Sequence, residues 1–456
     1  MNNQKENKMG VMPINKLLLS MSVPMMISML VQALYNVVDS IFVAQINEAA
    51  LTAVSLAFPM QNLMIALAVG MGVGVNANLS RFLGQKDFKS VNKTAGNGIV
   101  ICLISYLLFL LLGFTVTQTF FVAQAGPNET QIIEYGVSYL TICCVCSFGC
   151  FLQVMLERLL QSTGKTMYTM LAQGTGAIVN IILDPILIFG LFGFPRMEVA
   201  GAALATVAGQ IAGAALALIF NVKCNKEIRV SFRDFIPCRH IFGKIFSVGI
   251  PSTLMAAMGS VMTFAMNKIL VAFSTTAVAV FGVYFKLQSF IFMPVFGLNN
   301  GMVPIVSYNY GAQKKSRITK TILYSVFYAA GIMTIGLLIF QIFPELLLNL
   351  FDASEDMIAI GVPALRTIST CFLFASVSIV FISVFQAMGS GVFSMFISFT
   401  RQLIFLVPCA FLLSKTRNVN LVWLSFPIAE CGAIILSTLG YRSLYRRVIA
   451  PLGDSE

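Results

Sequence analysis

Long apolar runs, separated by short polar loops, alternate along almost the whole chain. Each run is long enough to cross a lipid bilayer as an α-helix, which takes about 20 apolar residues. The pattern predicts an all-α membrane protein with twelve transmembrane helices, at residues 15–45, 51–79, 92–118, 131–160, 167–190, 198–222, 243–272, 278–308, 318–342, 356–386, 392–414 and 419–441. Several runs are about 30 residues long, or about 45 Å as a helix, so we expect them to tilt or to extend beyond the membrane.

The two halves of the chain resemble each other at a nearly constant offset. Matching residues recur 227 positions apart early in each half and 225 positions apart later: Pro24 with Pro251, Gln61 with Gln288, Gly74 with Gly301, and Gln161 with Gln386. Since each half carries six spans, an even number, the halves share one orientation, and an axis along the membrane normal relates them. We therefore expect two pseudo-symmetric six-helix lobes, residues 1–222 and 245–456, joined by a basic cytosolic linker at residues 223–244.

Composition and charge agree with a membrane protein and predict its orientation. Of 456 residues, 58% are hydrophobic and 10% are charged, with a mean hydropathy of +0.87, whereas a soluble domain is usually about 25% charged. In a soluble protein, a net charge of +11 would suggest a nucleic-acid binding partner. Here most of the 29 Lys and Arg residues lie in loops on one side of the predicted membrane. The positive-inside rule then puts both termini in the cytosol, and no nucleic-acid partner is expected.

Asp184 is the most informative polar residue, because it lies inside the apolar run 167–190. An ionisable group there costs about 2.5 to 3.5 kcal/mol on insertion scales. Asn180 lies four residues earlier on the same helical face, and Pro185 removes the amide that would bond to the carbonyl of Ile181. Several oxygens therefore collect at one point. We interpret Asp184 as a functional residue; the plainer alternative is a carboxylate satisfied by a neighbouring hydroxyl.

Asp39 is a second acid inside an apolar run. Tyr35 and Asn36 precede it by four and three residues, which puts a phenol, an amide and a carboxylate on one stripe of the first span. Its plainer alternative is a cap or a snorkelling side chain near the outer surface. If Asp39 and Asp184 meet in an apolar lobe, both cannot stay ionised cheaply, so one should hold a proton or share a cation.

Three more polar residues complete the candidate oxygen set. Thr206 and Gln210 lie four residues apart in the sixth predicted span, and Tyr139 lies in the fourth. For Gln210 an interhelical hydrogen bond is the simpler interpretation.

The C-terminal half differs in the sign of its embedded charges. Four bases, Lys268, Lys286, Arg366 and Arg401, stand against one acid, Glu430. They cannot all pair within the lobe, so some must reach lipid phosphates, carbonyl groups, water or the other lobe's carboxylates. We expect Lys268 or Lys286 to face a central cavity, while Arg366 and Arg401 either do the same or extend to the membrane surface.

The 39 Phe and 24 Met residues set the character of the expected substrate path. Most of them should face lipid or the core, but rings and thioethers that line a cavity suit varied hydrophobic ligands, and rings attract cations. The candidate substrate cavity consists of Met60, Met64, Lys268, Phe281, Phe285, Lys286, Met293 and Glu430.

Other chemistry finds less support in the sequence. Glu157 and Arg158, at the cytosolic end of the fourth span, form either an inner gate or an exposed ion pair. The cysteines between Cys143 and Cys150 have no His partner nearby, which favours packing over a metal site. The phosphate-binding pattern G-x-x-x-x-G-K-[ST] does not occur, which argues against ATP hydrolysis by that route.

Several of these segments resemble the multidrug and toxic compound extrusion (MATE) family. The resemblance lies in residues 180–190 with Asn180 and Asp184, in residues 201–206 and 159–165, and in Pro24, Gln32 and Asp39 of the first span. With twelve spans in two matched halves it covers nearly the whole chain, and within the family it points to the bacterial DinF/MepA-like branch.

The resemblance implies a V-shaped pair of six-helix lobes around a central cavity, in the cytoplasmic membrane of a bacterium. Such a protein exports drug-like molecules in exchange for protons or sodium ions, and we expect it to act as a monomer without any other cofactor. Asp39, Asn180, Asp184 and Thr206 match the family's residues that bind the coupling cation, so Na⁺ can be expected there. The sodium-norfloxacin branch has further carboxylates in its seventh and tenth helices. Residues 249–272 contain no acid, so a C-lobe site of that kind is not expected.

These observations favour a secondary active antiporter over an enzyme. Neutralisation of Asp39 and Asp184 by a proton or cation would bias an alternating-access equilibrium and release an amphiphilic, cationic drug outward, a role in antibiotic resistance. An alternative is a flippase for a lipid-linked anionic glycan, whose head group the four C-terminal bases would bind. A membrane-embedded enzyme that uses Cys143 to Cys150 as thiol catalysts is a third interpretation, without a His base near in sequence.

Overall fold

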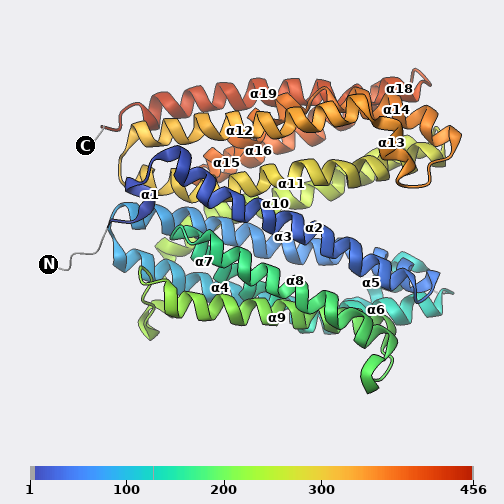
Figure 1. The fold of residues 1–456 in the computed structure, drawn as a ribbon, viewed down its shortest axis with the longest axis horizontal. Helices are drawn as coiled ribbons and strands as arrows, with labels where there is room; N and C mark the ends of the chain where they lie inside the picture. Colours follow the sequence, from blue (N-terminus) through green and yellow to red (C-terminus); the bar gives the residue numbers. More distant parts are fainter. Residues whose placement is uncertain (1–5, 127, 454–456) are drawn as a thin grey trace. The chain divides into compact units, whose positions relative to one another are not determined.

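All regular elements in the described part of the chain are helices (Figure 1). The computed structural model describes residues 6–126 and 128–453. The first half contains α1 (Lys8–Val11), α2 (Ile14–Ala44), α3 (Glu48–Gly84), α4 (Phe88–Thr115), α5 (Thr117–Ala125), α6 (Thr130–Val145), α7 (Phe148–Ser162), α8 (Thr166–Phe189), η1 (Leu191–Gly193), α9 (Glu198–Cys224) and η2 (Phe232–Phe235).

The second half contains α10 (Arg239–Val271), α11 (Thr275–Gly311), α12 (Lys315–Ile342), α13 (Pro344–Asn349), α14 (Glu355–Ser369), α15 (Phe372–Ala387), α16 (Gly391–Phe399), η3 (Thr400–Leu406), α17 (Val407–Ser414), α18 (Val419–Val422), α19 (Ser425–Leu444) and η4 (Tyr445–Ile449). The predicted all-α fold is confirmed.

The number of membrane-spanning helices also agrees with the prediction. Within the described residues, ten helices are long and apolar enough to cross a membrane, and the number reaches twelve if two bent pairs each form one span. The pairs are α6 with α7, which bend by 44°, and α14 with α15, which bend by 51°. They correspond to the predicted spans at residues 131–160 and 356–386, so two of the twelve spans are broken.

Polar residues begin equivalent helices in the two halves. Asn47 Oδ1 accepts a hydrogen bond from Ala50 N at 2.7 Å at the start of α3, and Ser274 Oγ accepts one from Ala277 N at 3.0 Å at the start of α11. Asn47 and Ser274 are 227 residues apart, the offset found in the sequence. The internal repeat therefore extends to the caps, which satisfy backbone N–H groups that a helix start leaves without partners.

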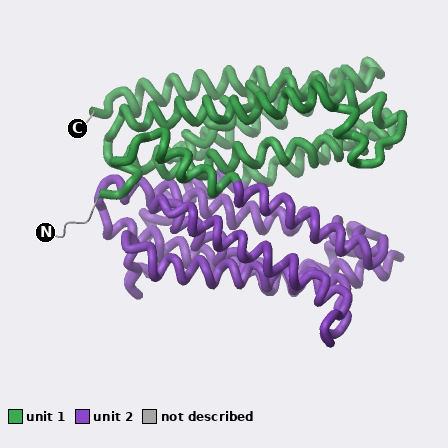
Figure 2. Tube along the Cα trace, viewed as in Figure 1, with its two compact units in different colours: residues 1–26, 254–456 green, residues 27–253 purple. Residues whose placement is uncertain are grey.

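The chain divides into two compact units whose borders lie inside helices (Figure 2). Unit 1 consists of residues 1–26 and 254–456, and unit 2 of residues 27–253. The first part of α2 thus belongs with the C-terminal half, and the first part of α10 with the N-terminal half. The borders differ from those of the expected lobes at residues 1–222 and 245–456, which stay a prediction.

Repeated glycines allow close packing where these two helices begin. In unit 1, a Cβ atom at Gly301 of α11 would lie 2.5 Å from Ser22 Oγ of α2. In unit 2, a Cβ atom at Gly74 of α3 would lie 2.4 Å from the Ile245 carbonyl oxygen of α10. Gly74 and Gly301 are one of the matched pairs in the sequence. Their missing side chains allow the same close helix contact in each unit.

The segment expected as a linker, residues 223–244, belongs to unit 2 and is docked there. Asn97 of α4 donates through Nδ2 to the Asp234 carbonyl oxygen at 3.0 Å, and its Oδ1 accepts from Cys238 N at 2.9 Å. Asn92 Oδ1 accepts from Arg229 N at 2.8 Å. Two asparagines of α4 therefore hold this segment by its backbone.

Candidate functional site

The centre of the candidate site lies where α8 and α9 run side by side (Figure 1). A Cβ atom at Gly209 of α9 would lie 2.5 Å from the Gly176 carbonyl oxygen of α8, so glycine is needed for this approach. The close contact lets Asn180 Nδ2 donate to Thr206 Oγ1 at 3.4 Å and to Asp184 Oδ1 at 3.5 Å. The predicted group of Asn180, Asp184 and Thr206 is therefore brought together.

Asp184 is fully buried, at 0% exposure, although it lies in a helix that crosses the membrane. Pro185 follows it inside α8, so the carbonyl of Ile181 lacks its usual helix bond. Asp184 Oδ2 and Asn180 Oδ1 are enclosed and have no hydrogen-bond partner among the described residues. Oxygens with this environment can hold a proton, a cation or water.

Asp39 of α2 completes an acid pair with Asp184. The two carboxyl groups lie within hydrogen-bonding reach of each other, and Asp39 Oδ1 is enclosed without a protein donor in the described chain. Burial and mutual repulsion both raise the free energy of the state in which both are ionised. The arrangement can therefore take up one proton or one cation at low cost. A functional role for Asp39 stays a prediction, which its closeness to Asp184 supports.

Two phenols lie beside the acid pair. Tyr35 is close enough to Asp39 and Asp184 to interact with them electrostatically, and Tyr139 of α6 is close enough to Asp39 and Tyr35. The Tyr139 hydroxyl accepts a hydrogen bond from Gln61 Nε2 of α3 at 3.1 Å. The cluster thus draws polar side chains from α2, α3, α6, α8 and α9.

Some members of this cluster were missed by the sequence analysis. Gln61 was noted only as one half of a repeated pair, and it contacts both Tyr139 and, at 3.6 Å, Cys143 Sγ. Gln173 Nε2 of α8 donates to Gln32 Oε1 of α2 at 2.9 Å. A polar residue inside a predicted span is a signal that could have found Gln61 and Gln173.

Asn36 and Gln210 are not joined to the acid pair by any hydrogen bond within the described residues. Asn36 is exposed, and its backbone carbonyl accepts from Ser40 Oγ at 2.8 Å. Gln210 lies at the contact of α9 with α7, where its Cβ would be 3.4 Å from a Cβ placed at Gly149.

In unit 1, the predicted basic residues separate into exposed and paired ones. Lys268, Lys286 and Arg366 are exposed; Lys268 Nζ lies 5.7 Å from the Phe264 ring centre and Lys286 Nζ 5.9 Å from that of Phe351. Each ring attracts the ammonium group above it, which stabilises that group's position.

Arg401 instead pairs with Glu430. Arg401 Nη1 donates to Glu430 Oε1 at 2.8 Å, and the side chains are 22% and 12% exposed. Arg401 lies in η3, a π-helical turn, which widens the helix at this point. Arg401 thus has a carboxylate partner within unit 1, while its position relative to the membrane surface stays a prediction.

The predicted cavity aromatics form part of a buried ring cluster in unit 1. Phe281 packs on Phe285 with ring centres 4.8 Å apart and on Trp423 at 6.4 Å, and Tyr284 contacts Phe426 at 5.8 Å. The methionines differ in exposure: Met64 is buried, while Met60 and Met293 are half-buried.

Glu157 and Arg158 are both buried, at 8% and 5% exposure, so the exposed ion pair expected as one alternative is wrong. Glu157 Oε1 accepts from Gln153 Nε2 at 2.9 Å, and Arg158 Nη1 donates to Gln161 Oε1 at 2.9 Å. Gln153 and Gln161, which lie one turn away on the same helix, give both charged groups a hydrogen-bond partner inside the bundle.

Cys143, Cys144 and Cys150 are buried, in keeping with a packing role. In residues 6–126 and 128–453, no group of three or more His, Cys, Asp or Glu side chains is arranged to hold a metal ion.

A bundle of apolar helices that encloses carboxyl oxygens of Asp39 and Asp184 is typical of a multi-pass membrane transporter. Comparison with known proteins agrees: the MatE family model matches residues 24–186 and 251–412. The chain belongs to the MatE family.

Its relatives include the multidrug export protein MepA of Staphylococcus haemolyticus, 27% identical over 437 residues that cover 95% of each chain. The FAD transporter of Shewanella oneidensis is 25% identical over 445 residues, 96% of each chain. Among solved structures, an outward-facing multidrug resistance MATE family transporter of the MOP superfamily superposes with a TM-score of 0.90 at 25% identity, over 99% of each chain. These relatives are transporters, which agrees with the prediction that the chain is not an enzyme.

Proposed function

We propose that the protein is a secondary active multidrug efflux antiporter, which exports amphiphilic cationic drugs in exchange for protons or sodium ions. The observation that carries the proposal is the pair of the half-buried Asp39 and the buried Asp184, with the oxygens of Asn180 and Thr206 beside it. Similarity to the multidrug export protein of S. haemolyticus supports export of drugs.

The mechanism follows from competition for one charge. While the pair carries a negative charge, it attracts a cationic drug or a coupling cation. When a proton or sodium ion neutralises it, the attraction for the drug is lost and the preferred helix packing changes. A ligand can shift an equilibrium between two conformations only through such a difference in affinity, and neutralisation of Asp39 and Asp184 supplies it.

We further infer the setting in which this cycle runs. The protein acts as a monomer in the bacterial cytoplasmic membrane, with both termini in the cytosol, membrane lipid around it and no nucleic-acid partner. The lobes at residues 1–222 and 245–456 move relative to each other during alternating access. Sodium, if it is the coupling ion, binds Asp39, Asn180, Asp184 and Thr206, and Tyr35 and Tyr139 support that set. Export of this kind would contribute to antibiotic resistance.

Efflux of a fluorescent cationic dye from proteoliposomes tests the proposal. An imposed pH gradient or sodium gradient should drive dye movement by the wild-type protein. The Asp39→Asn, Asp184→Asn double variant should lose this response, because neither residue can then change charge. Undiminished gradient-driven efflux by the double variant would overturn the proposal.

A flippase for a lipid-linked anionic glycan is the second candidate. It is favoured by the exposed bases of unit 1, Lys268, Lys286 and Arg366, and by the relative named as an FAD transporter, since FAD carries phosphate groups. Susceptibility tests on a host that expresses the protein separate the two candidates. Unchanged resistance to every cationic dye and biocide would favour the flippase.

A further inference from the structure

Two large apolar side chains point outward from the docked segment, residues 223–244. Phe232, in the short turn η2, is 96% exposed, and Ile236, four residues later, is 66% exposed. No other large apolar side chain of the described chain is more exposed than Phe232. Single apolar residues at a surface are common, but a fully exposed ring with a second apolar residue one turn away indicates a surface that binds a partner.

A fixed backbone displays these side chains. Ser231 N donates to Asp234 Oδ2 at 2.8 Å, and Ser231 Oγ donates to the same oxygen at 3.0 Å, which closes η2 around Phe232. A Cβ atom at Gly96 of α4 would lie 2.4 Å from the Asp234 carbonyl oxygen, so the turn lies directly on α4. Together with the asparagine bonds from α4, these contacts hold the backbone and leave the apolar side chains outside.

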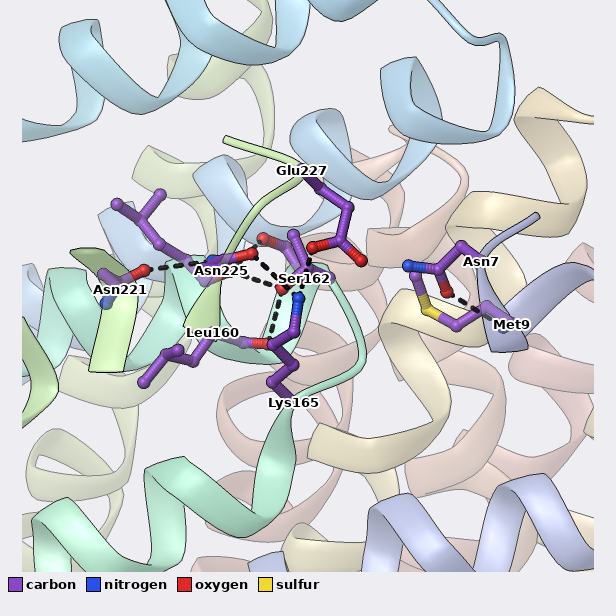
Figure 3. A network of polar contacts seen from close by, with 10 residues as sticks. Asn7, Met9, Leu160, Ser162, Lys165, Asn221, Asn225 and Glu227 are labelled. Carbon is purple, nitrogen blue, oxygen red and sulfur yellow. Dashed lines mark hydrogen bonds and ion pairs between the residues drawn. The ribbon is translucent and has the colours of Figure 1, made fainter. Parts of the chain in front are cut away.

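A polar network beside the ends of α8 and α9 holds the beginning of the segment (Figure 3). Asn225 Nδ2 donates to Asn221 Oδ1 at 3.1 Å, and Lys165 Nζ donates to Asn225 Oδ1 at 3.3 Å. Lys165 also pairs with Glu227. A lysine of the bundle therefore compensates the acid in this part of the segment.

The charges left at the surface of the segment are positive. Residues 223–244 contain six Lys and Arg residues against two acids, Glu227 and Asp234, and both acids have partners. The sixth base, Lys244, lies near both Arg81 and Asp87. The other five bases are exposed and form no ion pair within the described chain: Lys223, Lys226, Arg229, Arg233 and Arg239. The surface is thus complementary to an anionic partner.

The place of the segment in the chain puts this surface next to a membrane. It joins α9 to α10, and both helices are long and apolar enough to cross a bilayer. Exposed apolar side chains among bases are typical of segments that lie on an anionic membrane surface, where the apolar groups enter the boundary of the acyl chains and the bases attract phosphate. The positive-inside rule accounts for the bases but not for Phe232 and Ile236.

We propose that residues 223–244 form a binding surface for anionic phospholipids, in which Arg229 and Arg233 bind the phosphates of the head groups and Phe232 and Ile236 enter the acyl boundary. The two arginines lie within three residues of Phe232, so charge and ring act on the same patch of membrane. Phospholipid is the partner that is always present beside a segment between two spanning helices. The inference goes beyond the proposed antiport and does not depend on it, since the acid pair takes no part.

Quenching by brominated lipids tests this surface in the full-length protein. Phe232→Trp adds an indole to the segment, while Trp423, the single Trp of the sequence, is fully buried in unit 1 and gives a background that the wild type measures. The variant is reconstituted into phosphatidylcholine that contains either acyl-brominated phosphatidylglycerol or acyl-brominated phosphatidylcholine. Both should quench, because the indole enters the apolar boundary, and the anionic lipid should quench more at equal mole fraction. The two curves give the affinity of the surface for the anionic lipid relative to the neutral one.

Removal of the arginines should lower this relative affinity. Each Lys or Arg near an anionic surface strengthens binding about fivefold, so Arg229→Gln in the Phe232→Trp background should lower it about fivefold. Arg229→Gln together with Arg233→Gln should lower it about 25-fold. Raised salt should lower it in Phe232→Trp itself, since salt screens exposed charges. The salt dependence needs no further substitution, so it tests the charges even if the double arginine variant does not fold.

Phe192→Trp is the matched control. Phe192 is 88% exposed in η1, another short turn of the same unit, and Arg196, four residues later, is paired with Glu198 at 3.3 Å. An exposed ring is therefore present there without an unpaired base beside it. An indole at this position should show equal affinity for the two lipids.

A structural role for the two arginines would give a different result. The unfolding midpoint of the double arginine variant in lipid-free detergent should equal that of Phe232→Trp alone, because backbone bonds hold the segment. Lys415→Gln with Arg417→Gln, which removes two exposed bases of unit 1, should leave the relative affinity unchanged. The inference is overturned if neither brominated lipid quenches Phe232→Trp, if both lipids bind with equal affinity, or if the double arginine variant keeps the preference for the anionic lipid.

Discussion

The carboxyl groups of Asp39 on α2 and Asp184 on α8 lie within hydrogen-bonding reach of each other inside the helix bundle of unit 2. Each has an enclosed oxygen that no donor of the described chain satisfies. Neighbouring acids with enclosed oxygens favour uptake of one positive charge.

The contact of α8 with α9 should depend on Gly209. Gly209→Ala would put a Cβ atom 2.5 Å from the Gly176 carbonyl oxygen and 3.1 Å from Asn180 Cβ. The helices must then separate, and we expect a loss of about 1 to 3 kcal/mol in stability, with weaker dye binding because Asn180 moves. Thermal unfolding in detergent and dye titration measure the two effects.

Gly174→Ala is the matched control on α8. A Cβ atom there would have no heavy atom within 4 Å, so the substitution should be neutral or slightly stabilising. Equal losses in Gly174→Ala and Gly209→Ala would contradict the importance of the glycine contact.

The ion pair of unit 1 should show strong coupling between its members. Arg401→Met leaves the Glu430 carboxylate without its partner, and since the two side chains are 22% and 12% exposed, we expect a cost of about 3 kcal/mol. The Arg401→Met, Glu430→Leu double variant removes both charges and should regain most of that stability. Unfolding midpoints of wild type, Arg401→Met, Glu430→Leu and the double variant make up a double-mutant cycle, which measures the coupling between the two side chains.

Arg366→Met serves as the control for that cycle, because Arg366 is exposed and should contribute little. Strictly additive effects of the Arg401 and Glu430 substitutions would mean that the pair makes no net interaction.

Docking of residues 223–244 should depend on Asn97. Asn97→Ala removes the bonds to the Asp234 carbonyl oxygen at 3.0 Å and to Cys238 N at 2.9 Å, so trypsin should cut at Arg229 or Arg233 sooner than in the wild type. Thr94→Ala is the control, because the buried Thr94 hydroxyl donates to the Ser90 carbonyl oxygen of its own helix, and no bond from it to residues 223–244 is found in the described chain. Equal cleavage rates in Asn97→Ala and wild type would show that the segment is held by other contacts.

The fold could be predicted from the sequence because its signals are local. Apolar run length defines the spans, and the spacing of four residues between Asn180 and Asp184 puts both on one helical face. The borders of the compact units could not be predicted, since they depend on the first halves of α2 and α10 packing in the other half's bundle.

The candidate site was predictable only in part, for a related reason. Thr206 and Tyr139 were named from their own spans, whereas Gln61 and Gln173 join the cluster through contacts between helices far apart in sequence. Arg401 in η3 pairs with Glu430 in α19, 29 residues later. Helical spacing predicts contacts within one helix, so it could not predict this pair between two helices. Glu157 and Arg158 were misjudged as possibly exposed because charges near a predicted helix end usually face water, while here polar partners on α7 accompany them into the bundle.

Dye affinity as a function of pH and sodium concentration tests the central claim most directly. Purified wild-type protein should bind a cationic fluorescent dye less tightly as pH falls or as sodium rises, because the added proton or sodium ion occupies the Asp39–Asp184 pair. In the Asp39→Asn, Asp184→Asn variant this dependence should vanish. If the variant keeps the wild-type dependence on pH and sodium, charge uptake occurs elsewhere in the protein and the account is wrong.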